Sequence, residues 1–342
     1  MFNPKYTISN NLLANIKRIS LIISELNNQN FSRIILLDLE RRARTISSYS
    51  STSIEGNPLP LTEVKQILKD KPENARDSEK EVLNYNKALI ELDALIKIGH
   101  KDFDVKLIEQ IQQTITEGLI EAHRCGHIRR EPVFVNNPKT GQTVYLPPDH
   151  QEVDVLLNEL FVYLDENKNI IDPLILAGIL HKQFVVIHPF VDGNGRTTRL
   201  VTKILLARMG LDTFRLFSFE NYYNKNVSRY FQEVGVLGNY YDIKDKIDYT
   251  SWLEYFTDGI IDELLRVIKE LEKEDNSPEK ELKNHHKKII SYIKKHGFIT
   301  DRDYSKLTER AKPTRNLDFR KLIADDIIEK LGKGKATYYK LS

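Results

Sequence analysis

Apolar residues recur at three- and four-residue spacing through most of the first 275 residues, which is the period of an amphipathic helix. The pattern predicts helices at 8–26, 34–56, 62–70, 78–99, 104–120, 150–166, 173–188, 195–209, 218–236 and 249–273. The second of these should stop at Gly56, because glycine accepts a left-handed C-cap and Pro58 and Pro60 prevent continuation. Asp172 should cap the helix that Pro173 opens. This part of the chain is therefore predicted to be mainly α-helical.

One segment of the core has a strand pattern instead. Residues 131–148 read EPVFVNNPKTGQTVYLPP, in which β-branched and aromatic residues flank the turn NNPKTG. This arrangement predicts a β-hairpin at about 133–145.

The last 65 residues form a separate pattern after a linker near residues 272–284, a stretch that also fits the start of a solvated helix. Helices are predicted at 282–296, 301–307 and 313–324, followed by two short strands around a Lys-Gly-Lys turn. Three helices and a β-wing outline a winged helix-turn-helix domain. We therefore expect three regions: an N-terminal helical region (1–100), a core (101–275) and a C-terminal domain (276–342).

Charge and composition narrow the class of protein. Residues 279–342 hold 17 Lys and Arg against 9 Asp and Glu, although the whole chain has a net charge of only +2. A basic C-terminal region on a mildly acidic body suggests a second task or an anchor. The sequence has no apolar run long enough to span a membrane and no secretory signal pattern. The single cysteine, Cys125, excludes an intramolecular disulfide, so we expect a cytoplasmic protein.

The segment HPFVDGNGRTTR, residues 188–199, concentrates candidate chemistry. Proline should end the preceding helix after His188, and Gly193 and Gly195 allow consecutive backbone N–H groups to turn inward as an anion-binding nest at the start of the next helix. His188 lies across this loop, and imidazole is suited to act as a general base.

Charged side chains extend this site. Arg196 and Arg199 are three residues apart, so both guanidinium groups project from one side of the first helical turn and suit several phosphates. Asp192 offers a single carboxylate, which suits a Mg²⁺ ion already partly coordinated by phosphate oxygens.

The segment from His188 to Arg199 resembles the complete signature of the Fic family, and Gly195 occupies the position where related Doc-type kinases carry lysine. His181, the 133–145 hairpin with Pro147-Pro148, the stretch NYYNKNVSRYF and Trp252 extend the resemblance over residues 1–275. The resemblance implies a Fic-type helical core with a β-hairpin flap that docks the target.

The resemblance further implies a protein adenylyltransferase that transfers AMP from Mg·ATP to a Ser, Thr or Tyr hydroxyl of a target or of itself. His188 would be the base and Asp192 would hold Mg²⁺. The ATP-binding residues would be Gly193, Asn194, Gly195, Arg196 and Arg199, with Asn226 and Tyr230 as weaker candidates for the nucleoside pocket.

A second motif, Ser51-Thr52-Ser53-Ile54-Glu55-Gly56-Asn57, resembles the inhibitory motif of this family. In this motif Ser51 lies four residues before Glu55. The carboxylate of Glu55 would pair with Arg199 and so occupy the guanidinium group that should hold the γ-phosphate. In some relatives the matching glutamate also helps to remove AMP, so the reverse reaction is open.

Two other functions remain open from sequence. The chain could be a DNA-binding regulator with a nucleotide-sensing body, since Lys312, Arg315, Arg320 and Lys321 lie on or beside the third C-terminal helix and Lys333 and Lys335 on the wing. Alternatively, a Fic enzyme could transfer UMP or phosphocholine. The sequence also leaves open which protein is the target and whether the protein forms a homodimer.

Overall fold

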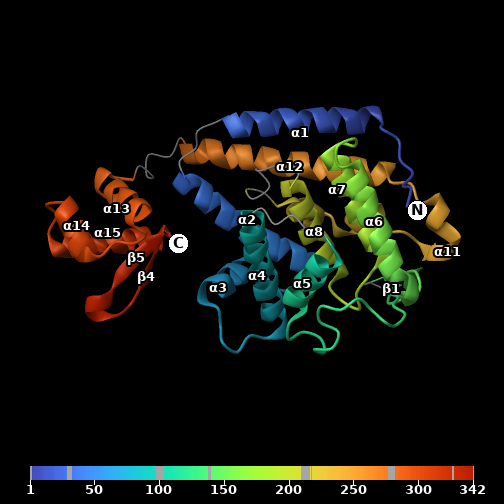
Figure 1. The fold of residues 1–342 in the computed structure, drawn as a ribbon, viewed down its shortest axis with the longest axis horizontal. Helices are drawn as coiled ribbons and strands as arrows, with labels where there is room; N and C mark the ends of the chain where they lie inside the picture. The colour runs from blue at the N-terminus through green and yellow to red at the C-terminus, as the bar shows by residue number, and fades with distance from the viewer. Residues whose placement is uncertain are drawn as a thin grey trace. The chain divides into compact units, whose positions relative to one another are not determined.

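The computed structural model describes residues 2–28, 33–97, 104–137, 140–208, 216, 218–275, 282–325 and 327–341. The chain divides into two compact units, formed by residues 1–30 with 40–268 and by residues 31–39 with 269–342 (Figure 1). Predicted helix ends at 98–99 and 209, the turn residues 138–139 and the linker at 276–281 lie outside the described residues. None of the helices in the described ranges has the length and apolar character needed to cross a lipid bilayer.

Helices make up most of the first unit, and two of them have ends, residues 33–39 and 269–275, that belong to the second unit. They are α1 (Asn10–Asn28), α2 (Arg33–Ile54), α3 (Leu61–Asp70), α4 (Asp77–Lys97), α5 (Val105–Thr116), α6 (Val153–Asn167), α7 (Pro173–Ile187), α8 (Asn194–Arg208), α9 (Phe219–Lys225), α10 (Val227–Val234), α11 (Tyr240–Ile243) and α12 (Thr250–Asp275). The single helix predicted at 218–236 is wrong: Asn226 has a non-helical backbone (φ −146°, ψ 75°) that ends α9, and its side chain accepts a hydrogen bond from the N–H of Arg229 to cap α10.

The helix α7 lies at the centre of this unit. Thirteen of its 15 residues are buried, and it packs against α6, α8 and α10. As predicted, it starts at Pro173, with the carboxylate of Asp172 accepting a hydrogen bond from the N–H of Leu174 (2.8 Å). A helix buried on nearly all sides is a rigid base for the loop that follows it.

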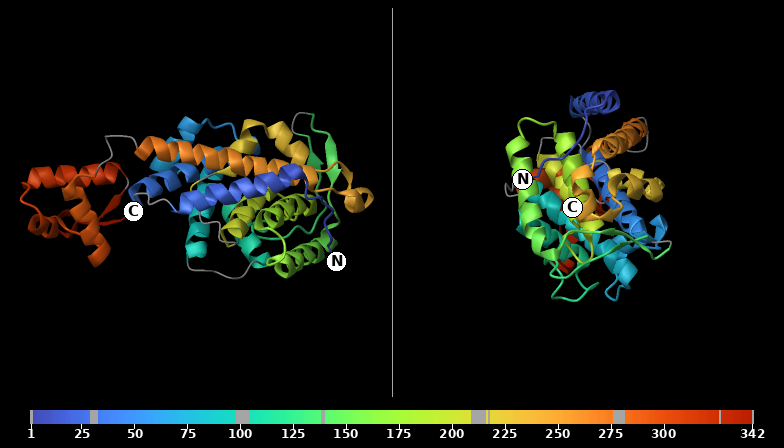
Figure 2. Two further views of the ribbon diagram at one scale, coloured as in Figure 1. Left: turned by 90° about the horizontal axis from the view of Figure 1, so that it is seen from above. Right: turned by 90° about the vertical axis from the view of Figure 1, so that its right-hand side faces the viewer.

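The first and last helices of the unit run side by side (Figure 2). Asn15 on α1 donates a hydrogen bond to the hydroxyl of Thr257 on α12 (3.1 Å). On another face of α12, the fully buried Trp252 donates its indole N–H to the carbonyl of Gly178 on α7 (2.8 Å). The absence of a side chain at Gly178 allows this close approach of the two helices.

A small sheet adjoins the helices. Strand β1 (Val135–Asn136) pairs antiparallel with β2 (Thr143–Leu146), and β2 pairs parallel with β3 (Gly238–Asn239). The first pair lies within the residues where the hairpin was predicted, and the third strand comes from a distant part of the chain. The order β1-β2-β3 leaves β1 at an edge of the sheet.

The second unit contains α13 (Asn284–His296), α14 (Asp301–Leu307), α15 (Lys312–Ala324), β4 (Ile328–Leu331) and β5 (Tyr338–Leu341), with the two strands antiparallel. Phe319 stacks on Tyr339 in its core at 4.0 Å between ring centroids. Asp318 is buried there and accepts hydrogen bonds from the hydroxyl of Tyr304 and the guanidinium of Arg310 (2.8 Å each). These elements lie within a few residues of the helices and strands expected from the sequence.

Replacement of Gly178 by alanine should destabilise the first unit. The added methyl carbon would lie 2.5 Å from Leu253 and 3.3 Å from Phe256. Overpacking of this kind costs about 1–3 kcal/mol, against a gain of about 1 kcal/mol in helix propensity. We expect a fall of a few degrees in the melting temperature measured by calorimetry. The double variant Gly178→Ala/Leu253→Ala should lose less than the sum of the two single variants, and strict additivity would contradict the contact.

Candidate active site

The loop between α7 and α8 is fixed by side chains that bind its main chain. The amide of Asn194 accepts from the N–H of Phe190 (2.9 Å) and donates to the carbonyl of the same residue (2.8 Å). Gln112 on α5 donates to the carbonyl of Asp192 (3.1 Å). Gly193 has a φ of +81°, a conformation that favours glycine. The loop therefore has one defined shape, and Asn194 supports it with its side chain.

The helix α8 begins at Asn194, one residue before the predicted start. The N–H of Gly193 donates to the carboxylate of Asp192 (2.6 Å), so it is already used within the loop. The N–H groups of residues 194–196 belong to the first turn, where no intrahelical acceptor exists. The backbone groups suited to bind an anion are therefore those of residues 194–196.

His188 is the C-cap of α7 and has a left-handed backbone, with φ of 54°. Its Nδ1 lies 3.3 Å from the carbonyl oxygen of Val185. Since a carbonyl only accepts, Nδ1 carries the proton and Nε2 presents a lone pair. Burial lowers the pKa of His188 to about 4, so the ring is neutral near pH 7. A neutral imidazole with an unprotonated Nε2 is suited to accept a proton.

Arg199 is completely buried and lies against the end of α2. Its Nη2 donates to Oε1 of Glu55 (2.7 Å), so the pairing expected from the sequence is present. Its Nε donates to the hydroxyl of Ser51 (2.7 Å), and its Nη2 also donates to the Ser51 carbonyl (2.9 Å). The helix ends at Ile54 and Gly56 has a φ of +97°, which places Glu55 in the turn beside Arg199.

Gly195 gives the Glu55 carboxylate its space. A methyl carbon added to Gly195 would overlap Oε1 of Glu55 and lie 3.1 Å from Nη1 of Arg199. A side chain at this position would therefore take the space that the Glu55 carboxylate occupies beside the guanidinium group.

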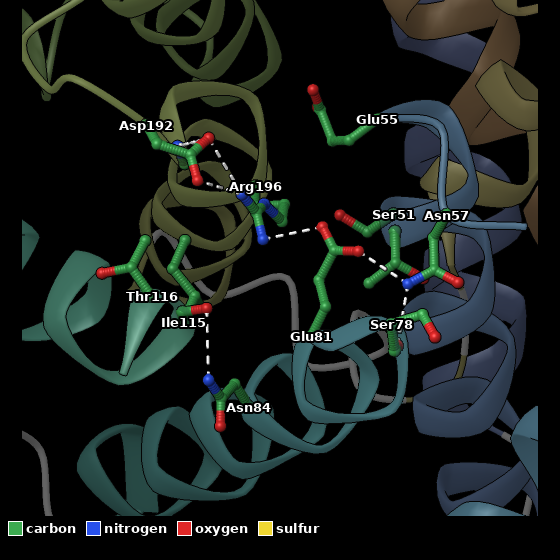
Figure 3. A network of polar contacts seen from close by, with 12 residues as sticks. Ser51, Glu55, Asn57, Ser78, Glu81, Asn84, Ile115, Thr116, Asp192 and Arg196 are labelled. Carbon is green, nitrogen blue, oxygen red and sulfur yellow. Dashed lines mark hydrogen bonds and ion pairs between the residues drawn. The ribbon is translucent and has the colours of Figure 1, made fainter. Parts of the chain in front are cut away.

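Arg196 is also held by carboxylates, from two different elements (Figure 3). Its Nη1 lies 2.7 Å from Oε1 of Glu81 on α4, and its Nη2 lies 3.0 Å from Oδ2 of Asp192. Glu81 in turn accepts a hydrogen bond from the amide of Asn57 (2.6 Å), the last residue of the Ser51–Asn57 motif. Sequence reasoning missed Glu81, because no local motif marks it and only the packing of α4 on α8 brings it to the site.

Comparisons with known proteins show what part of this site is similar to. Residues 102–206, which include the loop between α7 and α8, match the Fic/DOC family. This part of the chain is a Fic domain. A curated relative named protein adenylyltransferase Fic, from Aedes aegypti, is 28% identical over 228 residues, covering 61% of this chain and 43% of the relative. The relative of that name from Drosophila melanogaster is 30% identical over 166 residues, covering 47% and 32%. The matched stretch thus spans less than half of these relatives.

Solved structures share the fold of the chain. A Fic family protein from Desulfovibrio desulfuricans superimposes with a TM-score of 0.66 at 21% identity, covering 100% of this chain and 98% of that one. Fic-1 from Caenorhabditis elegans gives a TM-score of 0.59 at 22% identity, covering 77% and 73%.

Asp192 offers the Fic domain a carboxylate with 46% of its side chain exposed. Within the described part of the chain, one group of three potential metal ligands is found, His285, His286 and Asp318, and it lies in the second unit. A cation at Asp192 would therefore take its remaining ligands from water and phosphate oxygens. This donor set fits Mg²⁺, which usually keeps several waters and binds one or two protein carboxylates.

The two candidate nucleoside residues have structural contacts in this state. Asn226 caps α10, as described above. Tyr230 is only 1% exposed, and its hydroxyl lies 3.1 Å from Nε2 of His181 and 3.4 Å from Nη1 of Arg199. His181 is completely buried among aromatic rings, where burial lowers its pKa well below the usual value. The hydroxyl of Tyr230 therefore helps to hold Arg199 in place. For Asn226 and Tyr230 alike, contact with a nucleoside stays a prediction.

The titration of His188 should occur far below that of an ordinary histidine. Since burial favours the neutral ring, the folded protein should take up this proton only near pH 4, whereas the unfolded chain takes it up near pH 6.5. We expect ¹⁵N NMR of the imidazole to show a neutral ring from pH 8 down to about 5. The spectrum of His188→Gln assigns the signal, and a midpoint above pH 6 would contradict the burial of this ring.

Proposed function

We propose that this protein is a protein adenylyltransferase, which transfers AMP from Mg·ATP to a Ser, Thr or Tyr hydroxyl of a target protein. The observation that supports it most is the combination of a neutral His188 and the first turn of α8 with its two arginines. The N–H groups and the guanidinium groups suit a triphosphate, and the imidazole suits the proton of a hydroxyl. Curated relatives of the Fic domain carry the name of this activity.

The proposed reaction is an in-line substitution at the α-phosphorus. Nε2 of His188 takes the proton of the target hydroxyl, and the oxygen forms a bond to the α-phosphorus. The bond to the bridging oxygen breaks, and pyrophosphate leaves with its electrons. The N–H groups of residues 194–196 bind the α-phosphate, while Arg196 and Arg199 stabilise charge on the leaving group. Mg²⁺ held by Asp192 would reduce the repulsion among the phosphates.

We propose further that Glu55 inhibits this reaction. Its carboxylate occupies the guanidinium that the γ-phosphate needs. Two like charges about 4 Å apart repel by about 4 kcal/mol at an effective dielectric constant of about 20. A triphosphate beside Glu55 would therefore bind weakly or in an unproductive position. Whether the same carboxylate serves a reverse, AMP-removing reaction is a separate proposal for this site.

The target is proposed to dock on the flap at 133–145. Strand β1 is an edge strand, so its outer backbone groups are suited to pair with an extended segment. Phe134, immediately before β1, is 61% exposed and would offer an apolar contact. Recognition of this kind selects an extended strand more than a particular side chain. Self-modification and a homodimer are compatible with the same surface.

Glu55→Gly should raise the incorporation of label from [α-³²P]ATP into the enzyme and into lysate proteins at least tenfold, because it releases Arg199. Glu55→Gln is the matched control: it keeps the size of the side chain but removes the charge, so its activity should lie between those of the wild-type protein and Glu55→Gly. His188→Ala in the Glu55→Gly protein should abolish the labelling. Equal labelling by the wild-type protein and Glu55→Gly would contradict the inhibitory role.

The position of the label separates the alternatives. Label from [α-³²P]ATP but not from [γ-³²P]ATP should appear on protein, since pyrophosphate leaves. Transfer of γ-label would indicate a kinase. Preferential labelling from UTP or from CDP-choline would indicate transfer of UMP or phosphocholine.

DNA binding by the second unit is a second candidate function. Helix α15 carries exposed Lys312, Arg320 and Lys321. Arg315 is committed to both carboxylate oxygens of Asp301 (2.8 and 3.0 Å), so it contributes less than the sequence suggests. The wing adds exposed Lys333, whereas the side chain of Lys335 lies outside the described residues.

If this surface binds DNA, the logarithm of the affinity should fall linearly with the logarithm of the salt concentration, with a slope of about −0.9 for each phosphate contacted. Arg320→Ala/Lys321→Ala should make the slope shallower by about 1–2, measured by fluorescence anisotropy. Lys65→Ala/Lys69→Ala, which removes exposed lysines from α3, is the control. A slope unaffected by the α15 variant would exclude this surface. Under the regulator hypothesis, His188→Ala should retain full function.

A further inference from the structure

The carbonyl groups at the C-terminal end of α7 accept hydrogen bonds from the segment that carries the flap. The last four carbonyl groups of a helix have no partner within it. In α7 the carbonyls of residues 184 and 185 accept from the N–H and Nδ1 of His188. The carbonyl of residue 186 accepts from the hydroxyl of Tyr145 (2.8 Å), and that of residue 187 accepts from the guanidinium of Arg129 (3.4 Å). The catalytic helix is thus completed by side chains from either side of the flap turn.

Arg129 makes the larger set of contacts. Its Nε donates to the carbonyl of His188 (2.8 Å), and its main-chain N–H donates to the carbonyl of Pro189 (2.9 Å). Its guanidinium also donates to the carbonyls of Glu131 (3.2 Å) and Pro148 (2.6 Å). These last two residues lie just before and just after the flap. One side chain therefore joins both ends of the flap to the catalytic loop.

The position of Arg129 is unusual for a cation. It is 3% exposed, and the four hydrogen bonds of its guanidinium group described above all go to main-chain carbonyls. Burial lowers the pKa of Arg129, as expected for a charge removed from water without a bonded carboxylate. Burial of this charge is unfavourable for folding, so Arg129 is better explained by a role in positioning the main chain that it contacts than by a role in stability.

His188 needs this support. A left-handed backbone is unfavourable for a non-glycine residue and persists where the surroundings fix it. The hydrogen bond from Arg129 fixes the peptide plane after His188, and Tyr145 fixes the turn before it. We infer that Arg129, assisted by Tyr145, is a positioning residue that holds His188 in register with the flap, so that a hydroxyl docked there meets Nε2. This inference rests on the proposed function.

The test uses Glu55→Gly as the parent protein. Arg129→Lys keeps the charge but cannot reach all the carbonyls, and we expect it to lower kcat about 100-fold, the usual effect of a displacement of about 1 Å. The dissociation constant for ATP should change less than about threefold, because Arg129 does not touch the proposed phosphate site. Guanidinium added to Arg129→Ala should restore part of the activity. Arg130→Ala, an exposed neighbour, is the matched control and should match the parent.

Tyr145→Phe removes one hydroxyl and should fold even if the Arg129 variants do not. Loss of one neutral hydrogen bond, about 0.5–1.5 kcal/mol, corresponds to a fall in kcat of about 2- to 12-fold. A kcat equal to that of Arg130→Ala in both Arg129→Lys and Tyr145→Phe would overturn the inference. So would a loss of ATP affinity as large as the loss of kcat.

The imidazole ¹⁵N spectrum separates failure of the inference from failure of the proposed function. The parent should show the Nδ1–H form of His188, and Arg129→Lys should show a mixture of tautomers. An unchanged Nδ1–H form in Arg129→Lys would overturn the inference at any level of activity. An inactive parent whose tautomer responds as expected would contradict the proposed function alone.

Discussion

Two buried guanidinium groups set the main electrostatic constraint on this structure. A charge removed from water needs a partner, and the side chains of Arg196 and Arg199 are nearly or completely buried at the start of α8. The protein supplies the partners from three separate elements: Glu55 after α2, Glu81 from α4 and Asp192 from the loop. The packing of α4 and the end of α2 beside α8 brings two of these three carboxylates to the guanidinium groups.

The junction of α7 and α8 provides the second half of the site. One helix ends with carbonyl groups that need donors, and the next begins with N–H groups that need acceptors. The flap segment satisfies the carbonyls through Tyr145 and Arg129. The N–H groups at residues 194–196 are left for a ligand, with the positive end of the helix dipole behind them. The same junction is therefore suited to orient the proposed base on one side and to attract an anion on the other.

The sequence predicted the parts of this site that depend on local chemistry. The helix limits around Asp172 and Gly56 follow from capping rules, and the turn with Gly193 follows from backbone freedom. The partner of Arg199 was predicted through the resemblance of the Glu55 motif. Glu81 was not, because an acidic residue in the first turns of a helix is common and carries no mark of its tertiary partner.

Other gaps have the same physical origin. The helix predicted at 218–236 continues an apolar period across Asn226, but the capping preference of asparagine interrupts it there. No local motif marks Arg129, and only the fold shows that its partners are carbonyls. The structural contact of Tyr230 with His181 was likewise not predicted, whereas its expected place in a nucleoside pocket stays a prediction. Long-range contacts decide each of these cases, and local periodicity does not report them.

Glu81 and Glu55 differ in the contacts that hold them in place. Glu81 is held by Asn57 as well as by Arg196, and it lies within a regular helix. Glu55 lies in a turn, and its carboxylate accepts a hydrogen bond from Arg199. If Glu55 moved away, the two hydrogen bonds to Ser51 would still hold Arg199 in place, with a charge that has lost its partner. Loss of one partner of a buried pair is costly, and an arriving phosphate would remove that cost. Under the proposed function, the carboxylate that pairs with Arg199 here would therefore also be the group whose departure makes the site most attractive to a triphosphate.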